Sequence, residues 1–554
     1  MLAPDAATAA QIARARTVDG VPHTRPMTAW ASIDALLMQR AAATPERDLI
    51  TFIDDDDRRG SQSYATFADR VARAATILAG HGIGRGDRVA TLAFNHPDTL
   101  LIYFACWRLG ATVAPQNAGE DDARISFILG NAAARLLVAA PDYAARAAAL
   151  CATLPHDCPL LLLDDAFHAR LAATPPVAPA VAPTLDDECL LVYTSGTTGA
   201  PKGVQLSHYN LLADAHAIAA WQQIDDTQRM MTILPIHHVN GIVVTTITPL
   251  YAGASIVLNR SFRASRFWQR IVDERITIVS VVPTILQFLC EAPQRPDRAR
   301  LVLRHIICGA GTLAVALAER FEAQFGVPIL HGYGLSETTC YSCFLPLDLT
   351  PDEHRAWLGA HGYPSIGVPI ATNEMAIHDP TGVELPDGQR GEIVIRGHNV
   401  MLGYFQRPDA NAEAFRHGWF RSGDEGFVRR DARGRPFFFI TGRLKELINR
   451  GGVKYSPFEI EEVLGRIPGV RVGLAVAFDN VYYGEEIGAY IVAEDGATLD
   501  AAAVLAACRA AMPFSKCPKV VVFGSEIPVT STGKYQRLRL KAHFAAWEQA
   551  QFRE

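Results

Sequence analysis

The sequence predicts an α/β protein with a large N-terminal domain of helix-covered sheets and a small C-terminal α/β domain. The chain has 554 residues, which corresponds to two to four domains of ordinary size. Hydrophobic residues make up 49% and charged residues 20%, a composition able to bury large cores. Short apolar strands alternate with segments of helical periodicity, which favours mostly parallel sheets covered by helices.

This alternation can be followed along the first part of the chain. Residues 87–96 read as a buried strand ending in a polar turn, and residues 97–111 have helical spacing with a glycine near the end. Residues 174–185 are rich in Pro and Ala and are expected to form an exposed connector into a strand at 189–194. Further apolar strands are expected at 134–140, 276–283 and 303–311.

The last hundred or so residues form a separate unit. Ser456 as N-cap, Pro457 in the first turn and Glu459 three residues after the cap predict the start of a helix. The boundary with the preceding domain is expected near residues 441–449. Strands are expected at 473–479 and 486–494, a helix at 499–512 and an apolar run at 519–524.

Charge and cysteine usage exclude several classes of protein. A formal net charge of −6 and a pI near 6.3 argue against a nucleic-acid binder, which usually has a basic surface. The ten cysteines are scattered, as in a cytoplasmic protein with reduced thiols. Cys340 and Cys343 form a lone C-x-x-C without the second half of a zinc site, so a structural role is expected for them.

Neither the N-terminus nor the longest uncharged stretch predicts a membrane or export function. The first twenty residues lack the continuous apolar core of a secretory signal. Residues 230–259 contain no Asp, Glu, Lys or Arg, but Pro235, Asn240 and Pro249 within them argue against a spanning helix. Buried strands and turns around a site are expected instead, with no stable membrane insertion and a cytoplasmic location.

A loop rich in glycine and hydroxyl groups, residues 193–203, has the composition of a polyphosphate site. It follows an apolar strand and precedes a helical segment. Hydroxyl groups come from Ser195, Thr197 and Thr198, close backbone approach from Gly196 and Gly199, and a positive charge from Lys202. The spacing differs from the Walker A pattern, because Gly199 and Lys202 are three residues apart.

With four later segments, this loop resembles the ordered motifs of the adenylate-forming (AMP-binding) superfamily, of the acyl-/aryl-CoA synthetase type. The resemblance covers roughly residues 30–545. The later segments are HGYGLSET at 331–338, FRSGD at 420–424, GRLKE at 442–446 running on to Gly452, and PVTSTGK at 528–534. The resemblance implies ATP, Mg²⁺ and CoA as cofactors, and a small-molecule carboxylic acid as substrate.

The resemblance also implies roles for single residues. Tyr333 would stack on adenine, Asp424 would accept both ribose hydroxyls, and Arg443 would lie near the ribose and α-phosphate. Lys534, His238 and Glu337 are the implied catalytic residues, and Glu337 with Thr194 the implied magnesium ligands. The implied ATP/AMP-binding residues are Thr194, Ser195, Gly196, Thr197, Thr198, Gly199, Lys202, Gly309, Ala310, Gly311, Tyr333, Gly334, Ser336, Asp424 and Arg443.

On the acid side, residues 234–241 are similar to the family's gate segment. His238 takes the place of the gate histidine, and His237 occupies the slot usually held by Phe or Tyr, which is a departure from the pattern. A buried structural histidine is an equal interpretation of His237. The expected acid pocket comprises His237, Asn240, Gly241 and Thr338, and its lack of Arg or Lys disfavours a second carboxylate in the acid.

The resemblance also divides the chain. It implies an N-terminal AMP-binding and acid-binding domain at 1–441, a hinge at 442–446, and a mobile C-terminal domain carrying the catalytic lysine at 447–554. Lys445 holds the hinge position, and Gly451 and Gly452 lie where the family makes room for the pantetheine arm of CoA.

Several alternatives stay open at this stage. A carrier protein could replace free CoA as acceptor, and a luciferase-like oxygenase or a catalytically silent nucleotide-binding protein are further hypotheses. The run from Gly309 to Ala314 also fits a dinucleotide-binding G-x-G-x-x-A, a weak pattern when alone. The identity and chain length of the acid, the pathway and the oligomeric state are not specified by the sequence.

Overall fold

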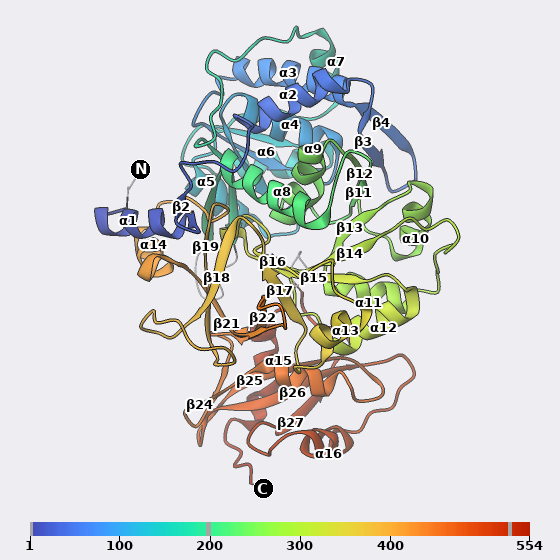
Figure 1. Ribbon diagram of the computed structural model, residues 1–554. Helices are drawn as coiled ribbons and strands as arrows, with labels where there is room; N and C mark the ends of the chain where they lie inside the picture. Colours follow the sequence, from blue (N-terminus) through green and yellow to red (C-terminus); the bar gives the residue numbers. More distant parts are fainter. Residues whose placement is uncertain (1–3, 195–200, 530–534, 554) are drawn as a thin grey trace.

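Large β-sheets covered by helices build most of the protein, and a smaller α/β unit lies at one end (Figure 1). The computed structural model describes residues 4–194, 201–529 and 535–553. The predicted α/β fold class is therefore confirmed, with a large N-terminal part and a smaller C-terminal part. Ser195, Gly196, Thr197, Thr198, Gly199 and Lys534, which were predicted as site residues, lie outside the described residues.

One sheet has a parallel centre and an antiparallel edge. Strand β9 pairs in parallel with β6 but in antiparallel with β10, which in turn pairs with the short strand β20. Its strand order is β20 (Gly403–Tyr404), β10 (Lys202–Ser207), β9 (Glu188–Thr194), β6 (Thr112–Gln116), β5 (Arg88–Leu92), β7 (Leu136–Ala139), β8 (Leu160–Leu162).

A second, longer sheet changes character half-way along. Strands β3, β12, β11, β13, β14 and β15 pair in parallel, whereas β16, β17, β18, β19, β21 and β22 pair in antiparallel, as does β4 with β3 at the other edge. Its order is β18 (Asn373–His378), β19 (Gly391–Gly397), β21 (Phe420–Arg430), β22 (Pro436–Arg443), β17 (Ser365–Pro369), β16 (Cys343–Phe344), β15 (Ile329–Tyr333), β14 (His305–Cys308), β13 (Ile278–Val281), β11 (Arg229–Thr232), β12 (Ser255–Asn259), β3 (Asp48–Ile53), β4 (Arg59–Ser63).

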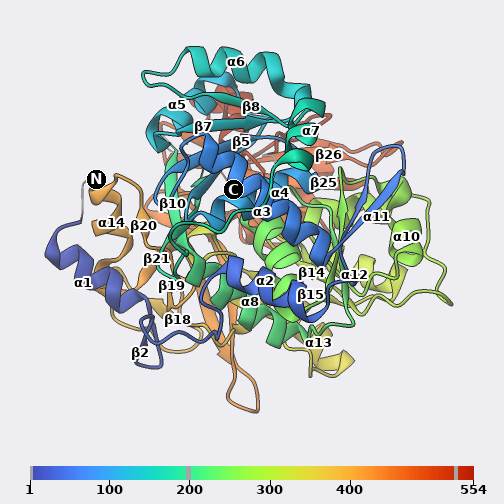
Figure 2. The same cartoon turned by 90° about the horizontal axis from the view of Figure 1, so that it is seen from above.

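The largest hydrophobic core lies between these sheets and the helices packed on them. Those helices are α2 (Ile33–Ala43), α3 (Tyr64–Gly80), α4 (Pro97–Arg108), α8 (His208–Gln222), the π-helix η2 (Asn240–Ile247) and α9 (Thr248–Ala252). The outer groups are α5 (Asp122–Ala132) with α6 (Ala144–Ala152), and α10 (Ala264–Asp273), α11 (Pro283–Glu291), α12 (Val315–Phe325) and α13 (Pro351–Gly359). Figure 2 shows α5 with α6 on one side and α10 to α12 grouped on another.

The remaining N-terminal helices pack at the periphery. Helix α1 (Ala6–Ala15) contacts η4 (Arg416–Gly418) and β19, and lies near α14 (Pro408–Ala414) in Figure 1. Helix α7 (Asp165–Ala173) packs on α3, and β1 (Thr17–Val18) pairs with β2 (Val21–Pro22). The short η1 (Pro141–Tyr143) leads into α6.

The C-terminal unit has its own sheet and core, at the lower end of Figure 1. Strand β22 ends at Arg443 and the next strand, β23, belongs to this other sheet. As expected, Ser456 caps a helix by accepting a hydrogen bond from the backbone N–H of Glu459 at 3.3 Å. The elements are β23 (Ile448–Arg450), β24 (Val453–Tyr455), α15 (Pro457–Leu464), β25 (Val470–Asn480), β26 (Gly484–Ala493), α16 (Ala501–Ala511), β27 (Val520–Phe523), α17 (Arg537–Leu540) and η5 (Lys541–Trp547).

The uncharged stretch from 230 to 259 lies in the interior, as expected, but its middle is helical and not made of strands and turns. It forms β11, η2, α9 and β12, whose side chains contribute to the cores. In the part of the chain that the structure describes, no helix has the length and apolar character needed to cross a bilayer.

Candidate active site

Tyr333, Asp424 and Arg443 form one half of the candidate site. Tyr333 ends β15, and its hydroxyl donates a hydrogen bond of 2.6 Å to Oδ2 of Asp424. Strands β21 and β22 are paired so that Asp424 lies opposite Arg443, whose Nε is 3.4 Å from Oδ1 of Asp424. The carboxylate is only 2% exposed, and its Oδ1 accepts no hydrogen bond from the described residues. It can therefore bind ribose hydroxyls.

The charges in this half support one another. The Asp424 carboxylate raises the pKa of the Arg443 guanidinium, and burial raises that of the Tyr333 phenol. The Asp424 backbone N–H also donates to the hydroxyl of Ser422 at 3.0 Å, which fixes the turn. Gly334 and Ser336 follow Tyr333, and Ser336 begins the short helix η3 (Ser336–Thr338).

Glu337, Tyr404 and Lys202 form the other half. Glu337 in η3 is 8% exposed, and its Oε1 accepts a hydrogen bond of 2.8 Å from the Tyr404 hydroxyl. The Lys202 ammonium lies 4.1 Å from the centre of the Tyr404 ring, a cation–π distance. Sequence analysis did not identify Tyr404, because its position depends on the pairing of β20 with β10, which no local pattern indicates.

Lys202 lies in a field of mixed charge. Burial lowers its pKa, the Glu337 carboxylate acts in the opposite direction, and the positive charge of Lys445 lowers it further. Thr194 is paired with Lys202 across β9 and β10, at the base of the glycine-rich loop.

The turn Gly309–Ala310–Gly311 follows β14, beside the strand that carries Tyr333. Ala310 has a φ of 62°, in the left-handed region. The backbone N–H of Gly309 donates to the carbonyl of Val281 at 3.3 Å, which ties the turn to β13. A Cβ atom at Gly309 would lie 2.9 Å from the carbonyl oxygen of Gly332, so the turn lies against the backbone next to Tyr333.

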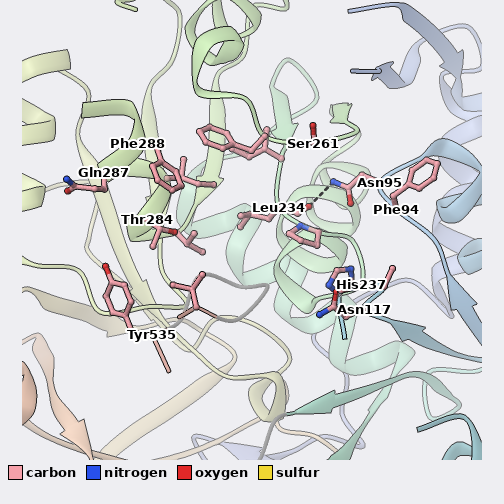
Figure 3. Close-up of a pocket in the computed structure, with 18 of the residues that line it drawn as sticks. Phe94, Asn95, Asn117, Leu234, His237, Ser261, Thr284, Gln287, Phe288 and Tyr535 are labelled. Atoms are coloured by element: carbon pink, nitrogen blue, oxygen red, sulfur yellow. Dashed lines mark hydrogen bonds between the residues drawn. The ribbon is translucent and has the colours of Figure 1, made fainter. Parts of the chain in front are cut away.

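His237 and His238 lie side by side, with ring centroids 4.4 Å apart. Burial lowers the pKa of His237 to about 4, so the ring is neutral at pH 7. Its Nε2 is buried without a hydrogen-bond partner among the described residues. His237 lines a cavity of about 680 Å³, on which Phe94, Asn95 and Phe288 also border (Figure 3).

The other predicted acid-pocket residues are buried and do not line that cavity. Asn240 is 7% exposed and lies 3.4 Å, through its Nδ2, from the hydroxyl of Tyr341. The carbonyl of Gly241 accepts hydrogen bonds from the hydroxyls of Thr245 and Thr246, inside η2. Thr338 is fully buried, and its hydroxyl accepts from the Leu335 backbone N–H.

The predicted hinge and CoA path connect the two units of the protein. Arg537 of α17 pairs with Glu446 at 3.1 Å and with Glu461 of α15 at 2.8 Å. Gly451 and Gly452 have φ values of 60° and 87°, and open space surrounds the Cβ position of Gly452. Tyr535, the residue after Lys534, lines the cavity from the C-terminal side (Figure 3).

Comparison with known proteins agrees with this geometry. The AMP-binding enzyme profile matches residues 37–405, and the AMP-binding enzyme C-terminal domain matches residues 459–534. The chain belongs to the AMP-binding enzyme family. The predicted resemblance is therefore confirmed.

Relatives share most of the length of this AMP-binding enzyme. A sulfoacetate–CoA ligase of Cupriavidus necator is 36% identical over 92% of this chain and 98% of its own. A feruloyl-CoA synthase of an Amycolatopsis species is 33% identical over 87% of this chain and 94% of its own. The crystal structure of ATP-bound MatB from Rhodopseudomonas palustris matches with a TM-score of 0.84 at 27% identity, covering 94% of this chain and 99% of that one.

Proposed function

We propose that the protein activates a carboxylic acid with ATP as an acyl-adenylate, releases pyrophosphate, and transfers the acyl group to CoA. It is accordingly an AMP-forming acid–thiol ligase, an acyl-CoA synthetase. The relatives named above are CoA ligases aligned over nearly the whole chain, and the similar crystal structure contains ATP. A carrier protein as acceptor, the alternative hypothesis, is not favoured by these relatives.

The contacts between side chains at the site support the roles that we propose for them. Asp424 offers a buried carboxylate oxygen for the ribose, and Tyr333 holds that carboxylate from the opposite side. Lys202 and Glu337 both contact Tyr404, so a cation and an anion flank one position. Such a pair suits a metal–phosphate group, with Lys202 on the phosphate oxygens and Glu337 on the metal.

Magnesium fits the donor groups available. Mg²⁺ is usually held by one or two carboxylates together with substrate phosphates, and Glu337 and Thr194 offer a carboxylate and a hydroxyl. Among the described residues, no group of three or more His, Cys, Asp or Glu could hold a metal ion without the nucleotide. When bound, Mg²⁺ would neutralise the charge of the leaving pyrophosphate.

In the first half-reaction, a carboxylate oxygen of the acid forms a bond to the α-phosphorus while the bond to pyrophosphate breaks. Negative charge builds up at the phosphorus, and positioned cations stabilise it. We assign this role to Lys534, with Arg443 near the ribose. His237 and His238 would border the acid.

In the second half-reaction, the sulfur of CoA bonds to the acyl carbon and AMP leaves. The predicted rotation about residues 442–446 would withdraw Lys534 and bring Gly451 and Gly452 toward the acyl group. The ion pair between Arg537 and Glu446 links the hinge to the C-terminal unit in this arrangement. We expect this ion pair to break when the C-terminal unit rotates.

Two measurements test the proposal. Exchange of labelled pyrophosphate into ATP should require both an acid and Mg²⁺, and CoA should then yield an acyl-CoA detectable by mass spectrometry. Absence of exchange with folded protein over fatty, aromatic and short acids would refute the proposal. Exchange without acyl-CoA, but with loading of a holo-carrier protein, would replace CoA by a carrier protein as acceptor.

A further inference from the structure

Tyr341 fills the space between the segments that are expected to hold the adenine and the acid. Its side chain is 2% exposed and its ring lies 4.3 Å from that of Phe344. A Cβ atom at Gly309 would lie only 2.5 Å from the Tyr341 hydroxyl, so the phenol occupies the room that this glycine leaves. On the gate side, Nδ2 of Asn240 lies 3.4 Å from the same hydroxyl.

The backbone of Tyr341 is held on both sides by buried polar groups. Its N–H donates to Oδ2 of Asp214 at 3.3 Å, and its carbonyl accepts from Nδ2 of Asn399 at 3.0 Å. Asn399 also donates to Oδ1 of Asp214 at 3.2 Å, which closes the network. Asp214 and Asn399 are fully buried. This part of the site is therefore rigid, and the ring cannot easily move aside for a larger ligand.

A buried polar atom without a partner lies next to the Tyr341 hydroxyl. Oδ1 of Asn240 is buried and has no hydrogen-bond partner among the described residues, while Nδ2 of the same side chain faces the hydroxyl. The Ser280 side chain also acts on the Tyr341 phenol and lowers its pKa, whereas burial raises that pKa overall. Buried polar groups of this kind are normally satisfied, so a ligand or a water with hydrogen-bonding capacity belongs here.

We propose that Tyr341 limits the acid to a short one whose far end carries an oxygen-bearing group, held by the Tyr341 hydroxyl with Asn240 and Ser280. The proposal rests on the function proposed above and specifies the substrate class of the same site. A long or aromatic acid would need the volume that the Tyr341 ring occupies. A short alkyl acid would leave the polar atoms unpaired, so it should react less well than an acid with a hydroxyl end. A carboxylate or sulfonate end is disfavoured, because Tyr341, Asn240 and Ser280 supply no positive charge.

A panel of acids tests this with the intact protein. Pyrophosphate release is measured with propionate, glycolate, malonate, sulfoacetate, hexanoate and benzoate at saturating ATP and Mg²⁺. We expect kcat/KM to be about 10-fold or more higher for at least one oxygen-ended short acid than for propionate, hexanoate or benzoate. Malonate and sulfoacetate should react less well than glycolate, because no cation among Tyr341, Asn240 and Ser280 would pair with their second anionic group.

Two substitutions at Tyr341 test separately the volume of its ring and the hydrogen bond of its hydroxyl. Tyr341→Phe keeps the ring, and should lower kcat/KM for the preferred oxygen-ended acid by about 10-fold more than kcat/KM for propionate. Tyr341→Ala should raise the hexanoate or benzoate value relative to the short acid. Tyr64→Phe is the matched control, since it removes another buried hydroxyl, bonded to the Ala254 carbonyl at 2.7 Å in the helical core. It should not change the ranking of acids.

Preference of the wild type for hexanoate or benzoate would overturn the inference but leave acid activation intact. It would indicate that the acyl chain runs past His237 into the 680 Å³ cavity instead. An unchanged ranking of acids in Tyr341→Phe would also overturn the inference. No pyrophosphate release with any acid would overturn both this inference and the proposed function.

Discussion

Asp424→Asn should weaken ATP binding without changing how the acid binds. The substitution keeps the shape of the side chain but removes the charge from a group that is 2% exposed. Hydrogen bonds to a charged group contribute about 1.5–3 kcal/mol and neutral ones about 0.5–1.5 kcal/mol, so each ribose hydroxyl should lose about 1–1.5 kcal/mol. Two such bonds amount to about 2–3 kcal/mol, or roughly a 30- to 160-fold rise in the KM for ATP.

The assay is pyrophosphate release at varied ATP and fixed acid, followed by varied acid at the highest ATP. Asp431→Asn is the control, because Asp431 lies in the turn of the same hairpin, where it accepts hydrogen bonds from Arg433 and Arg435. Melting temperatures show whether either variant is merely unstable. A KM for ATP within about threefold of the wild type in stable Asp424→Asn protein would refute the assignment of Asp424 to the ribose.

Three further predictions follow from the site and the cores. Lys534→Ala should slow adenylation by ~10²-fold or more, about 3 kcal/mol, yet largely spare thioester formation from a supplied acyl-adenylate; equal losses in both steps would contradict its role. Gly452→Leu should spare adenylation but slow thioester formation, because the leucine side chain would narrow the expected path of the pantetheine arm. The Cβ position is open, but the φ of 87° would strain a leucine by about 1–2 kcal/mol, so stability is compared as well. Thioester at the wild-type rate, by mass spectrometry, would disprove the assigned CoA path. Burial lowers the pKa values of His208 and His331 to about 4, below the ordinary 6.5. The folded state thus binds fewer protons, and the stability that these histidines contribute is complete above pH 6.5 and lost as the pH falls toward 4. The melting temperature should fall over that range, and a constant value would be evidence against buried neutral histidines.

The local elements could be predicted from sequence because their patterns are local. The strand and helix expected at 87–111 are β5 and α4, and the strands expected at 276–283 and 303–311 are β13 and β14. The expectation of mostly parallel sheets holds for most of the first sheet but for only one half of the second. In the other half, β21 and β22 form a hairpin through residues 431–435, which produces an antiparallel pair, whereas a parallel pair needs a longer crossover.

The parts of the site that sequence did not predict depend on long-range pairing. Tyr404 meets Glu337 because the two-residue strand β20 adds to β10, and because the backbone N–H of Met401 donates to the carbonyl of Glu337 at 2.9 Å. Tyr341 lies between Gly309 and Asn240, which are separated along the chain and brought together by β13, β14 and η2. Neither contact leaves a periodic or compositional signal in the sequence.

A few residues connect the proposed nucleotide site with the contact between the two units. Arg443 ends β22 and pairs with Asp424, the proposed ribose ligand, in the N-terminal part. Three residues later, Glu446 pairs with Arg537 of the C-terminal unit. Departure of AMP would change the charge around Asp424, and would therefore act on the short segment that carries both ion pairs. Because this segment coincides with the predicted hinge, we expect release of AMP and rotation of the C-terminal unit to be coupled through it.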